Sequence, residues 1–386
     1  MNGDNIYSEL LNLELNSKVN SLKDFISKVD YLIDWERFGK IPHRPSTSNL
    51  IRYCIDLFNI RLRKQYSFLL SSPIHHYLFK RLCRQTNAQT GLLFKFLCLN
   101  AQIEESLLYD ILNRDEINNY VRCGLFIKHN DKIFLPFTIL PYRNYYYLSD
   151  SKYIIENRNL YGIGPAHIGH PTHLQVIFLK NMLKDKHILR MLEMGSGIGI
   201  ITIEMCEFVK EREGAEIYKR NIEFSLANKE LRNDENVRFY QSDLFSNVKG
   251  KFDLISFNPW QPRDGGMPVI RKFLEQAPFF LTKDGNIFLL IYSNNIVLDE
   301  IAQILHKNSM IASNTITNSF YLTEQDGNIS LYTSNFLWIE HLKADKHKKL
   351  KRVIQTRRNL KWAVFIARRL LKSMYSCLVR RKKFKS

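Results

Sequence analysis

Apolar positions change their spacing along the second half of the chain. From residue 188 onward, short apolar runs that suit buried strands alternate with longer segments whose apolar residues recur at helical spacing. Strands that alternate with helices are typical of a parallel sheet covered by helices on both faces. We therefore predict an α/β fold with a Rossmann-like sheet. The expected strands are 188–195, 215–221, 237–243, 252–258 and 285–293, and the expected helices are 198–209, 224–233 and 267–281.

Two further apolar-rich segments close this part of the chain. Residues 319–325 and 330–341 flank the sequence Asp-Gly-Asn at 326–328, which is typical of a tight turn. We expect the two segments to form an antiparallel hairpin at the end of the sheet. The predicted α/β domain extends over residues 151–342.

The first part of the chain shows mainly helical spacing. Residues 1–87 contain two amphipathic segments interrupted by a stretch with Pro and Ser, and they predict a helical N-terminal region. In residues 88–150, three helical segments precede two short strands around a turn at 129–131. This is the order of a winged-helix domain. The three expected helices are 87–100, 103–112 and 115–126.

Two interpretations of this winged-helix-like domain are open. Its third helix could recognise nucleic acid, or the domain could dock a partner or cover a substrate. The third helix carries Asp115, Glu116 and Arg122, so it is not basic. The docking or lid interpretation is therefore favoured.

Charge is concentrated at the end of the chain. Residues 341–386 hold 17 Lys or Arg and one acid, a net charge of +16, whereas the whole chain carries +18. Residues 343–386 are predicted to be a basic tail, with an amphipathic helix whose apolar face runs from Ala363 to Leu378. This tail could bind RNA phosphates, lie on an anionic membrane surface or pack its apolar stripe on the protein body.

The remaining composition favours a cytoplasmic protein. Apolar residues make up 45% of the chain, enough for a sizeable core. No uncharged apolar run approaches the roughly 18 residues of a spanning helix. The first residues lack the basic and apolar regions of a secretory signal. The six cysteines are scattered without a Cys-x-x-Cys pair, so we expect buried thiols of a reducing compartment.

Three histidines in the segment before the sheet raise the question of a metal. His167, His170 and His173 are spaced at three, but Gly169 and Pro171 would disrupt a helix that could aim all three rings together. Neither a cysteine nor an acid completes a ligand set. We therefore predict no metal site.

A glycine-rich segment separates the first predicted strand of the sheet from its helix. Gly195, Gly197 and Gly199 would allow a sharp turn and a close approach to a ligand. A dinucleotide fingerprint would need its third glycine at Ile200, and Glu193 would repel a pyrophosphate but suit a cation. The pattern resembles the first motif of class I S-adenosylmethionine-dependent methyltransferases. In that family the glycine loop packs against the methionine part, and the acid helps to hold its ammonium group.

The resemblance implies further contacts with the cofactor. The family carries an acid for the ribose hydroxyls after the second strand, where this sequence has Asn221, with Glu223 as a fallback. Asn221 would bind a hydroxyl without charge assistance. After the third strand, Asp243 would accept a hydrogen bond from the adenine amino group, whereas a lone Asp there usually caps a turn or helix.

The sequence Asn258-Pro259-Trp260 follows the fourth predicted strand, at the edge where ligands bind in open α/β sheets. It resembles the Asn-Pro-Pro-Tyr motif of amino methyltransferases, in which the Asn oxygen and the Pro carbonyl accept the two N–H bonds of a planar amino group. Asn258 would thereby aim the nitrogen lone pair at the bound cofactor. Trp260 could replace the aromatic residue of the motif or fill space between strand and helix, and Gln261 departs from the motif.

The resemblance implies an enzyme that transfers a methyl group from S-adenosylmethionine. It is closest to the small-domain type, which includes RNA guanine, tRNA adenine and release-factor glutamine methyltransferases. The favoured acceptor is a planar amino or amide group on RNA or a translation-related protein. One alternative is a small-molecule N- or O-methyltransferase with an N-terminal lid. Another is a winged-helix binding protein with a degenerate cofactor fold, for which Asn221 is the best evidence.

Overall fold

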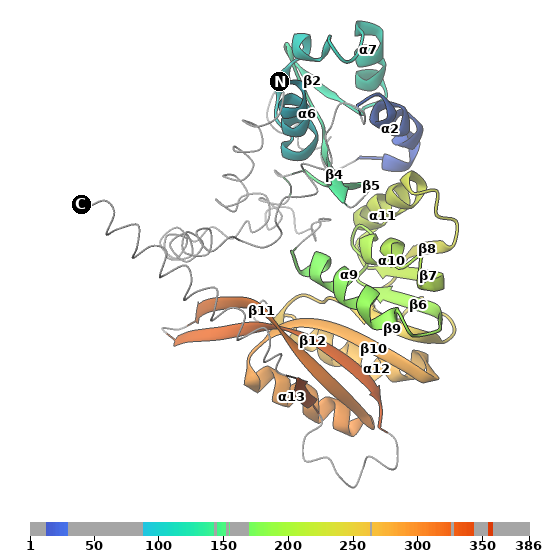
Figure 1. Cartoon of the computed structure of the whole chain (residues 1–386), viewed down its shortest axis with the longest axis vertical. Coiled ribbons are helices and arrows are strands. Elements are labelled where there is room, and N and C mark those ends of the chain that lie inside the picture. Colours follow the sequence, from blue (N-terminus) through green and yellow to red (C-terminus); the bar gives the residue numbers. More distant parts are fainter. Residues whose placement is uncertain are drawn as a thin grey trace, which may run out of the picture. The chain divides into compact units, whose positions relative to one another are not determined.

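The described residues of the computed structural model fall into two compact units, one before residue 168 and one after it (Figure 1). The described residues are 13–29, 88–142, 145–151, 154, 170–262, 265–325, 328–342 and 354–357. The second helix expected in residues 1–87, His167 and most of the predicted basic tail lie outside these ranges.

The first unit combines helices with short strands. Its helices are α2 (Leu15–Val29), α6 (Ala88–Leu99), the 3-10 helix η2 (Glu105–Leu108) and α7 (Arg114–Arg122), and its strands are β1 (Ile103–Glu104), β2 (Ile127–His129), β3 (Lys132–Phe134), β4 (Phe137–Tyr142) and β5 (Tyr145–Asp150). Strands β1, β3 and β2 form one antiparallel sheet, and β4 pairs with β5 in a separate hairpin. A capping box of Asn113 and Glu116 starts α7.

The predicted elements of this unit are confirmed in part. Helices α6 and α7 and the β2–β3 hairpin lie where they were expected. The helix expected over 103–112 is wrong, because these residues form β1 and the short η2 instead. The β4–β5 hairpin was not predicted. The winged-helix assignment of residues 88–150 stays a prediction.

Four aromatic rings join the helices of the first unit. The ring of Phe25 on α2 lies 6.4 Å from that of Phe96 on α6 and 5.5 Å from that of Tyr120 on α7, between centroids. The Phe126 ring, just after α7, lies 5.1 Å from Phe25 and 5.2 Å from Phe96. Each of these four pairs meets edge to face, an arrangement that aromatic rings prefer. The rings therefore bring α2 into one core with residues 88–126.

An eight-stranded sheet dominates the second unit. Its strands are β6 (Ile188–Met194), β7 (Val209–Glu216), β8 (Val237–Gln241), β9 (Phe252–Phe257), β10 (Leu281–Ser293), β11 (Met310–Gln325), β12 (Asn328–His341) and β13 (Ile354–Arg357). Their order across the sheet is β13-β11-β12-β10-β9-β6-β7-β8. Strands β10, β9, β6, β7 and β8 run parallel to one another. Strand β12 is antiparallel to both β10 and β11, so the predicted hairpin is confirmed.

Helices cover both faces of this sheet (Figure 1). They are α9 (His170–Leu183), α10 (Ile200–Glu204), α11 (Lys219–Leu231), α12 (Met267–Gln276), the 3-10 helix η4 (Ala277–Phe280) and α13 (Asn295–Lys307). On one face, Phe273 of α12 belongs to the same core cluster as Leu289 of β10. On the other face, the Phe178 ring of α9 lies 5.4 Å from Phe288 and 4.7 Å from Phe336. The predicted α/β architecture is confirmed.

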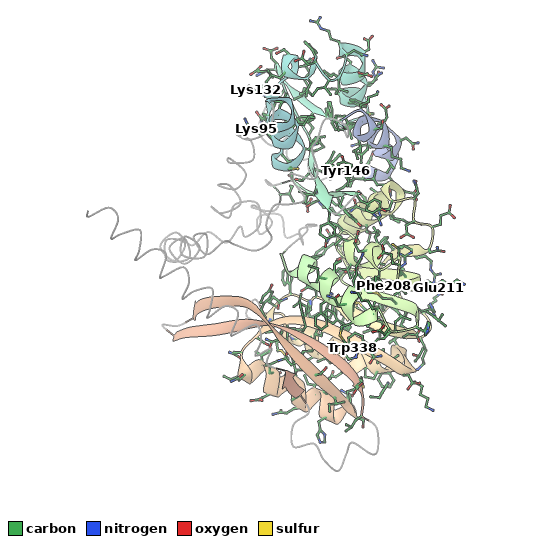
Figure 2. All side chains as sticks on the ribbon, viewed as in Figure 1. Lys95, Lys132, Tyr146, Phe208, Glu211 and Trp338 are labelled. Carbon is green, nitrogen blue, oxygen red and sulfur yellow. The ribbon has the colours of Figure 1, made fainter. Side chains whose placement is uncertain are left out.

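Polar contacts also fix the pairing of β10 with β12. Trp338 of β12, labelled in Figure 2, donates a hydrogen bond of 3.0 Å from its indole nitrogen to Oδ1 of Asn286 on β10. The Lys186 ammonium lies 4.9 Å from the centroid of the same ring. A cation over an aromatic face is attracted by the ring quadrupole. The two contacts tie the antiparallel strand to the parallel part of the sheet.

The structure differs from the predicted elements around the second strand of the sheet. This strand is β7, which ends at Glu216, so the strand expected over 215–221 is wrong and residues 219–221 begin α11. The helix expected over 198–209 is shortened to α10. Helix α13 was not predicted. Strand β13 lies within the segment expected to be a basic helical tail and pairs in parallel with β11.

Two expectations drawn from composition can be compared with the described residues. Within these ranges, no helix has both the length and the apolar character needed to cross a bilayer. Cys98 is buried and Cys123 is partly buried, but Cys206 is exposed, so the expectation of buried thiols is wrong for Cys206. The other three cysteines lie outside the described residues.

Candidate active site

The carboxyl ends of four neighbouring parallel strands bring the predicted site residues to one edge of the sheet. These strands are β9, β6, β7 and β8. In open α/β sheets this edge is where ligands bind. Gly195, Asp243 and Asn258 follow β6, β8 and β9, as predicted from the sequence. The residue that ends β7 is Glu216, whereas Asn221 lies in the first turn of α11.

Glycines shape the loop between β6 and α10. Gly195, Gly197 and Gly199 have φ angles of 64°, 55° and 77°, in the left-handed region that favours glycine. A Cβ at Gly199 would lie 2.5 Å from the Phe239 ring, so this glycine allows close packing. A Cβ at Gly197 would meet nothing within 4 Å. The loop at Gly197 therefore borders open space of the kind that a bound ligand fills.

Glu216, which was not predicted from the sequence, joins the end of β7 to this glycine loop. Its Oε2 accepts a hydrogen bond of 2.9 Å from the Gly197 N–H, and its Oε1 accepts one of 3.0 Å from the Tyr218 N–H. Burial raises the pKa of the Glu216 carboxyl. Glu216 stands after the second strand of the sheet, where the family resemblance requires an acid. Its place at the end of a strand rich in charged residues, directly before Ile217 and Tyr218, was the available signal.

Asn221 supports Glu216 rather than replacing it. The Asn221 side chain is buried in the first turn of α11. Burial has the largest effect on the pKa of Glu216, and a hydrogen bond from Asn221 is among the contacts that lower it. The Oδ1 atom of Asn221 has no hydrogen-bond partner in the described part of the chain. Glu223, the fallback, is a partly buried residue of α11. A direct contact between Asn221 and a ribose stays a prediction.

Glu193 lies beneath the loop and is bound to α10. Its Oε2 accepts a hydrogen bond of 2.8 Å from the backbone N–H of Thr202 and a short one from the Thr202 hydroxyl. Burial raises the pKa of Glu193 to about 8, and the nearby charge of Glu216 adds to this effect. Glu193 therefore holds the first turn of α10 in place. Its predicted contact with an ammonium group stays a prediction.

Asp243 presents an exposed carboxylate after β8. Its Oδ2 lies 3.5 Å from the Lys272 ammonium of α12, and both side chains are largely exposed. Its backbone N–H donates to the Ser246 hydroxyl at 3.1 Å, so here a serine side chain organises the turn. The Asp243 carboxylate is accessible to a ligand, and its role in binding adenine stays a prediction.

The segment after β9 turns sharply at Asn258 and Pro259. Asn258 is partly buried and Pro259 is buried, whereas Trp260 is 64% exposed. Trp260 therefore does not fill space between strand and helix. Its exposed ring beside Asn258 and Pro259 suits contact with a substrate, which stays a prediction.

The side-chain carboxamide of Gln261, in the same segment, forms three hydrogen bonds. Its Nε2 donates hydrogen bonds of 2.8 Å to the Pro259 carbonyl and 3.3 Å to Oδ1 of Asn258. Its Oε1 accepts a hydrogen bond of 2.6 Å from the backbone N–H of Tyr292. We call these three groups, Asn258 Oδ1, Pro259 O and Tyr292 N–H, the acceptor corner. The sequence marked Gln261 only as a departure from the motif.

The absence of a metal site stays a prediction. The described residues contain no group of three or more His, Cys, Asp or Glu side chains that could hold a metal ion. Helix α9 begins at His170 with Pro171 in its first turn, so this proline does not disrupt the helix as expected. His167 lies outside the described residues.

The donors and acceptors at this edge fit a cationic nucleotide. Gly197 borders open space, and the buried carboxyls of Glu216 and Glu193 lie close enough to influence each other. A positive charge placed nearby would offset that repulsion. The accessible Asp243 carboxylate can accept a hydrogen bond from an amino group. These features fit S-adenosylmethionine, which carries a sulfonium and an ammonium charge.

Comparisons with known proteins agree with this fit. Residues 175–324 match the family described as "Methyltransferase small domain". A protein of Methanocaldococcus jannaschii, named "Putative protein N5-glutamine methyltransferase", is 32% identical over 141 residues, which span 31% of this chain and 70% of that protein.

Two bacterial relatives match over a smaller share of their length. A ribosomal protein L11 methyltransferase of Thermosipho africanus is 35% identical over 119 residues, 31% of this chain and 42% of the relative. A release factor glutamine methyltransferase of Lactococcus lactis is 26% identical over 133 residues, 28% of this chain and 48% of the relative. The chain thus spans less than half the length of these two relatives.

Proposed function

The chain belongs to the methyltransferase small-domain family and is an S-adenosylmethionine-dependent enzyme, and we propose that it methylates a side-chain carboxamide nitrogen of a protein. The family and the class I Rossmann-like fold expected from the glycine loop are thereby confirmed. The nature of the acceptor is the proposed part of this function.

One observation carries the proposal. Asn258 Oδ1 and the Pro259 carbonyl both accept from the single nitrogen of a carboxamide, that of Gln261. An amide nitrogen is a poor nucleophile because its lone pair is shared with the carbonyl group. Two acceptors that bind both of its N–H groups hold that nitrogen in a fixed orientation, which lowers the barrier of a transfer. The Tyr292 N–H adds a donor for the carbonyl oxygen.

The cofactor would be held by the strand ends on the other side of this corner. S-adenosylmethionine supplies an electrophilic methyl group when it is bound. We propose that the loop at Gly197 faces its methionine part, that Glu216 accepts from its ribose hydroxyls and that Asp243 accepts from its adenine amino group. Two relatives carry names that refer to glutamine methylation, which supports a carboxamide acceptor.

RNA is the second candidate for the acceptor. Residues 341–386 carry a net charge of +16, and a segment of this charge favours binding to phosphates. An exocyclic amino group of a nucleobase also presents two N–H donors on one nitrogen. The carboxamide is preferred because the acceptor corner also offers the Tyr292 N–H to a carbonyl oxygen.

The test follows the methyl group. The full-length protein is incubated with S-adenosylmethionine labelled in the methyl group and with cell lysate, and the product is separated into protein, RNA and small molecules. We expect label in protein that yields N5-methylglutamine or N4-methylasparagine after enzymatic digestion. Asn258→Ala should abolish incorporation, whereas Asn236→Ala, an exposed residue before β8, should not. Label found in RNA but not in protein would contradict the proposal.

A further inference from the structure

The carboxamide of Gln261 occupies every group of the acceptor corner. Its nitrogen uses Asn258 Oδ1 and Pro259 O, and its oxygen uses the Tyr292 N–H. Each carbonyl oxygen has a second lone pair. However, the position from which one nitrogen reaches both oxygens is already taken by Nε2 of Gln261. A second amide or amino nitrogen cannot share that position.

The local backbone explains why Gln261 is held there. The parallel ladder between β9 and β10 ends at the pair of Phe257 and Leu289, because β9 stops at Phe257. The Tyr292 N–H lies beyond this point, and Gln261 Oε1 accepts its hydrogen bond in place of a strand carbonyl. A buried N–H left unpaired would be costly. Gln261 therefore satisfies the backbone N–H of Tyr292 on β10, and the same side chain fills the acceptor corner.

A glycine closes the loop that carries Gln261. The Gly266 N–H donates a hydrogen bond of 3.0 Å to the Gln261 carbonyl. A Cβ at Gly266 would lie 1.8 Å from the carbonyl oxygen of Trp260, so only glycine permits this close approach. The Gln261 main chain is thus fixed at this point, and its side chain can leave the corner by rotation about its own bonds.

We propose that Gln261 is an internal occupant of the acceptor corner, which excludes other amides until an acceptor displaces it. The proposal rests on the proposed function, because the corner is the site assigned to the acceptor. Displacement breaks three hydrogen bonds. A primary carboxamide remakes all three. A hydroxyl or an aliphatic amine lacks the pair of N–H donors with an adjacent carbonyl oxygen, so Gln261 also makes the corner selective.

The test uses propionamide, which has the shape of the glutamine side chain beyond its Cα atom. Gln261→Ala should leave the corner open, so propionamide should raise the thermal unfolding temperature of this variant. We expect the dissociation constant of propionamide to be at least about tenfold lower for Gln261→Ala than for the wild type, equivalent to about 1.4 kcal/mol. N,N-dimethylpropionamide, which has no N–H donors, should bind neither protein.

Matched controls separate this inference from the proposed function. Gln303→Ala removes an exposed glutamine of α13 and should respond to propionamide as the wild type does. Equal binding to the wild type and to Gln261→Ala would overturn the inference. The absence of binding to a folded Gln261→Ala would do so as well. Transfer of a labelled methyl group to propionamide is measured separately. If propionamide binds but is not methylated, the result counts against the proposed function and leaves the inference about Gln261 unaffected.

A measurement on the wild type does not depend on any variant that might not fold. The side-chain N–H protons of Gln261, assigned by NMR, should exchange with solvent at least about tenfold more slowly than those of the exposed Gln303, because hydrogen bonding protects them. Exchange of the Gln261 protons at the rate of Gln303 would show that its carboxamide does not occupy the corner.

Discussion

The backbone N–H of Gly197 donates a hydrogen bond of 2.9 Å to Oε2 of Glu216, and this contact joins the glycine loop to the end of the neighbouring strand β7. A Cβ at Gly197 would meet no atom within 4 Å, so the loop borders open space at this residue. One carboxyl thus positions the loop, and we propose that it also accepts hydrogen bonds from the ribose hydroxyls of the cofactor.

Glu216→Gln should weaken the binding of S-adenosylmethionine. The substitution removes the charge that strengthens a hydrogen bond to a ribose hydroxyl, and such bonds contribute about 1.5–3 kcal/mol. We therefore expect the dissociation constant to rise by roughly 10- to 100-fold, measured by isothermal titration calorimetry.

Glu223→Gln is the matched control, since Glu223 lies on the adjacent helix α11 and is the other acid considered for this role. It should change the dissociation constant by less than about twofold. A loss of affinity in Glu223→Gln, with Glu216→Gln unaffected, would reverse the assignment.

Gly197→Ala should also weaken cofactor binding, for a steric reason. The new methyl group would enter the open space beside the loop, so it would compete with the ligand and not with the protein. Gly265→Ala is a matched control, because Gly265 has a φ of 84° and open space around its Cβ position as well. Both variants should lose about 1–2 kcal/mol of stability from backbone strain. Only Gly197→Ala should raise the dissociation constant by about tenfold or more. Equal affinities in calorimetry would contradict this.

Glu193 should make the stability of the protein depend on pH. Its pKa rises from an ordinary value near 4.5 in the unfolded chain to about 8 in the folded protein, mainly because of burial. The folded state therefore holds the proton more tightly, and its stability falls as the pH rises from about 4.5 to about 8. Over this window the slope should be on the order of 1 kcal/mol per pH unit.

Urea unfolding at a series of pH values checks this prediction. The amide of Glu193→Gln does not titrate, so the difference in unfolding free energy between the two proteins should change across the window. Other titrating groups, Glu216 included, cancel to first order in that difference. A difference that stays constant from pH 5 to pH 8 would exclude a raised pKa at Glu193.

Trp260→Ala should reduce methyl transfer without reducing stability or cofactor affinity. The ring is 64% exposed, so its removal leaves no cavity. A stacking contact with an acceptor contributes about 0.5–1.5 kcal/mol, so the rate at low acceptor concentration should fall by roughly 2- to 13-fold. Phe279→Ala removes a 75% exposed ring of η4 and should have no effect on label incorporation. Similar losses in both variants would assign the effect to a general change of the surface.

Strands of the sheet that form continuous apolar runs were predicted correctly from the sequence. Strand β7, which carries buried charged residues, was misplaced. Strand β7 contains Arg212 and Glu213, which are only 3% and 4% exposed. Arg212 pairs with Asp234 at 2.8 Å, and Glu213 pairs with Arg190 at 2.7 Å. These partners lie more than 20 residues away along the chain, so a local pattern cannot show that the charges are satisfied. Because the strand was expected to end at residue 221 instead of 216, the cofactor-binding position after it was assigned to Asn221 and not to Glu216.

Other residues of the candidate site were also predicted where they follow an apolar strand and missed where their role depends on a distant contact. Gly195, Gly197, Asp243 and Asn258 follow strands with a clear apolar pattern, and the structure brings all four to one edge. The role of Gln261 depends on a backbone N–H of β10, 31 residues further along the chain, and no spacing in the sequence reveals that contact.

A crystal structure of the full-length protein with S-adenosylmethionine would show where the cofactor and its methyl group lie. We expect the nucleotide to lie across the carboxyl ends of β6, β7 and β8, with its ribose hydroxyls bound to Glu216 and its methyl group directed at the acceptor corner. A nucleotide bound elsewhere, or one whose methyl group points away from Asn258 and Pro259, would contradict this expectation.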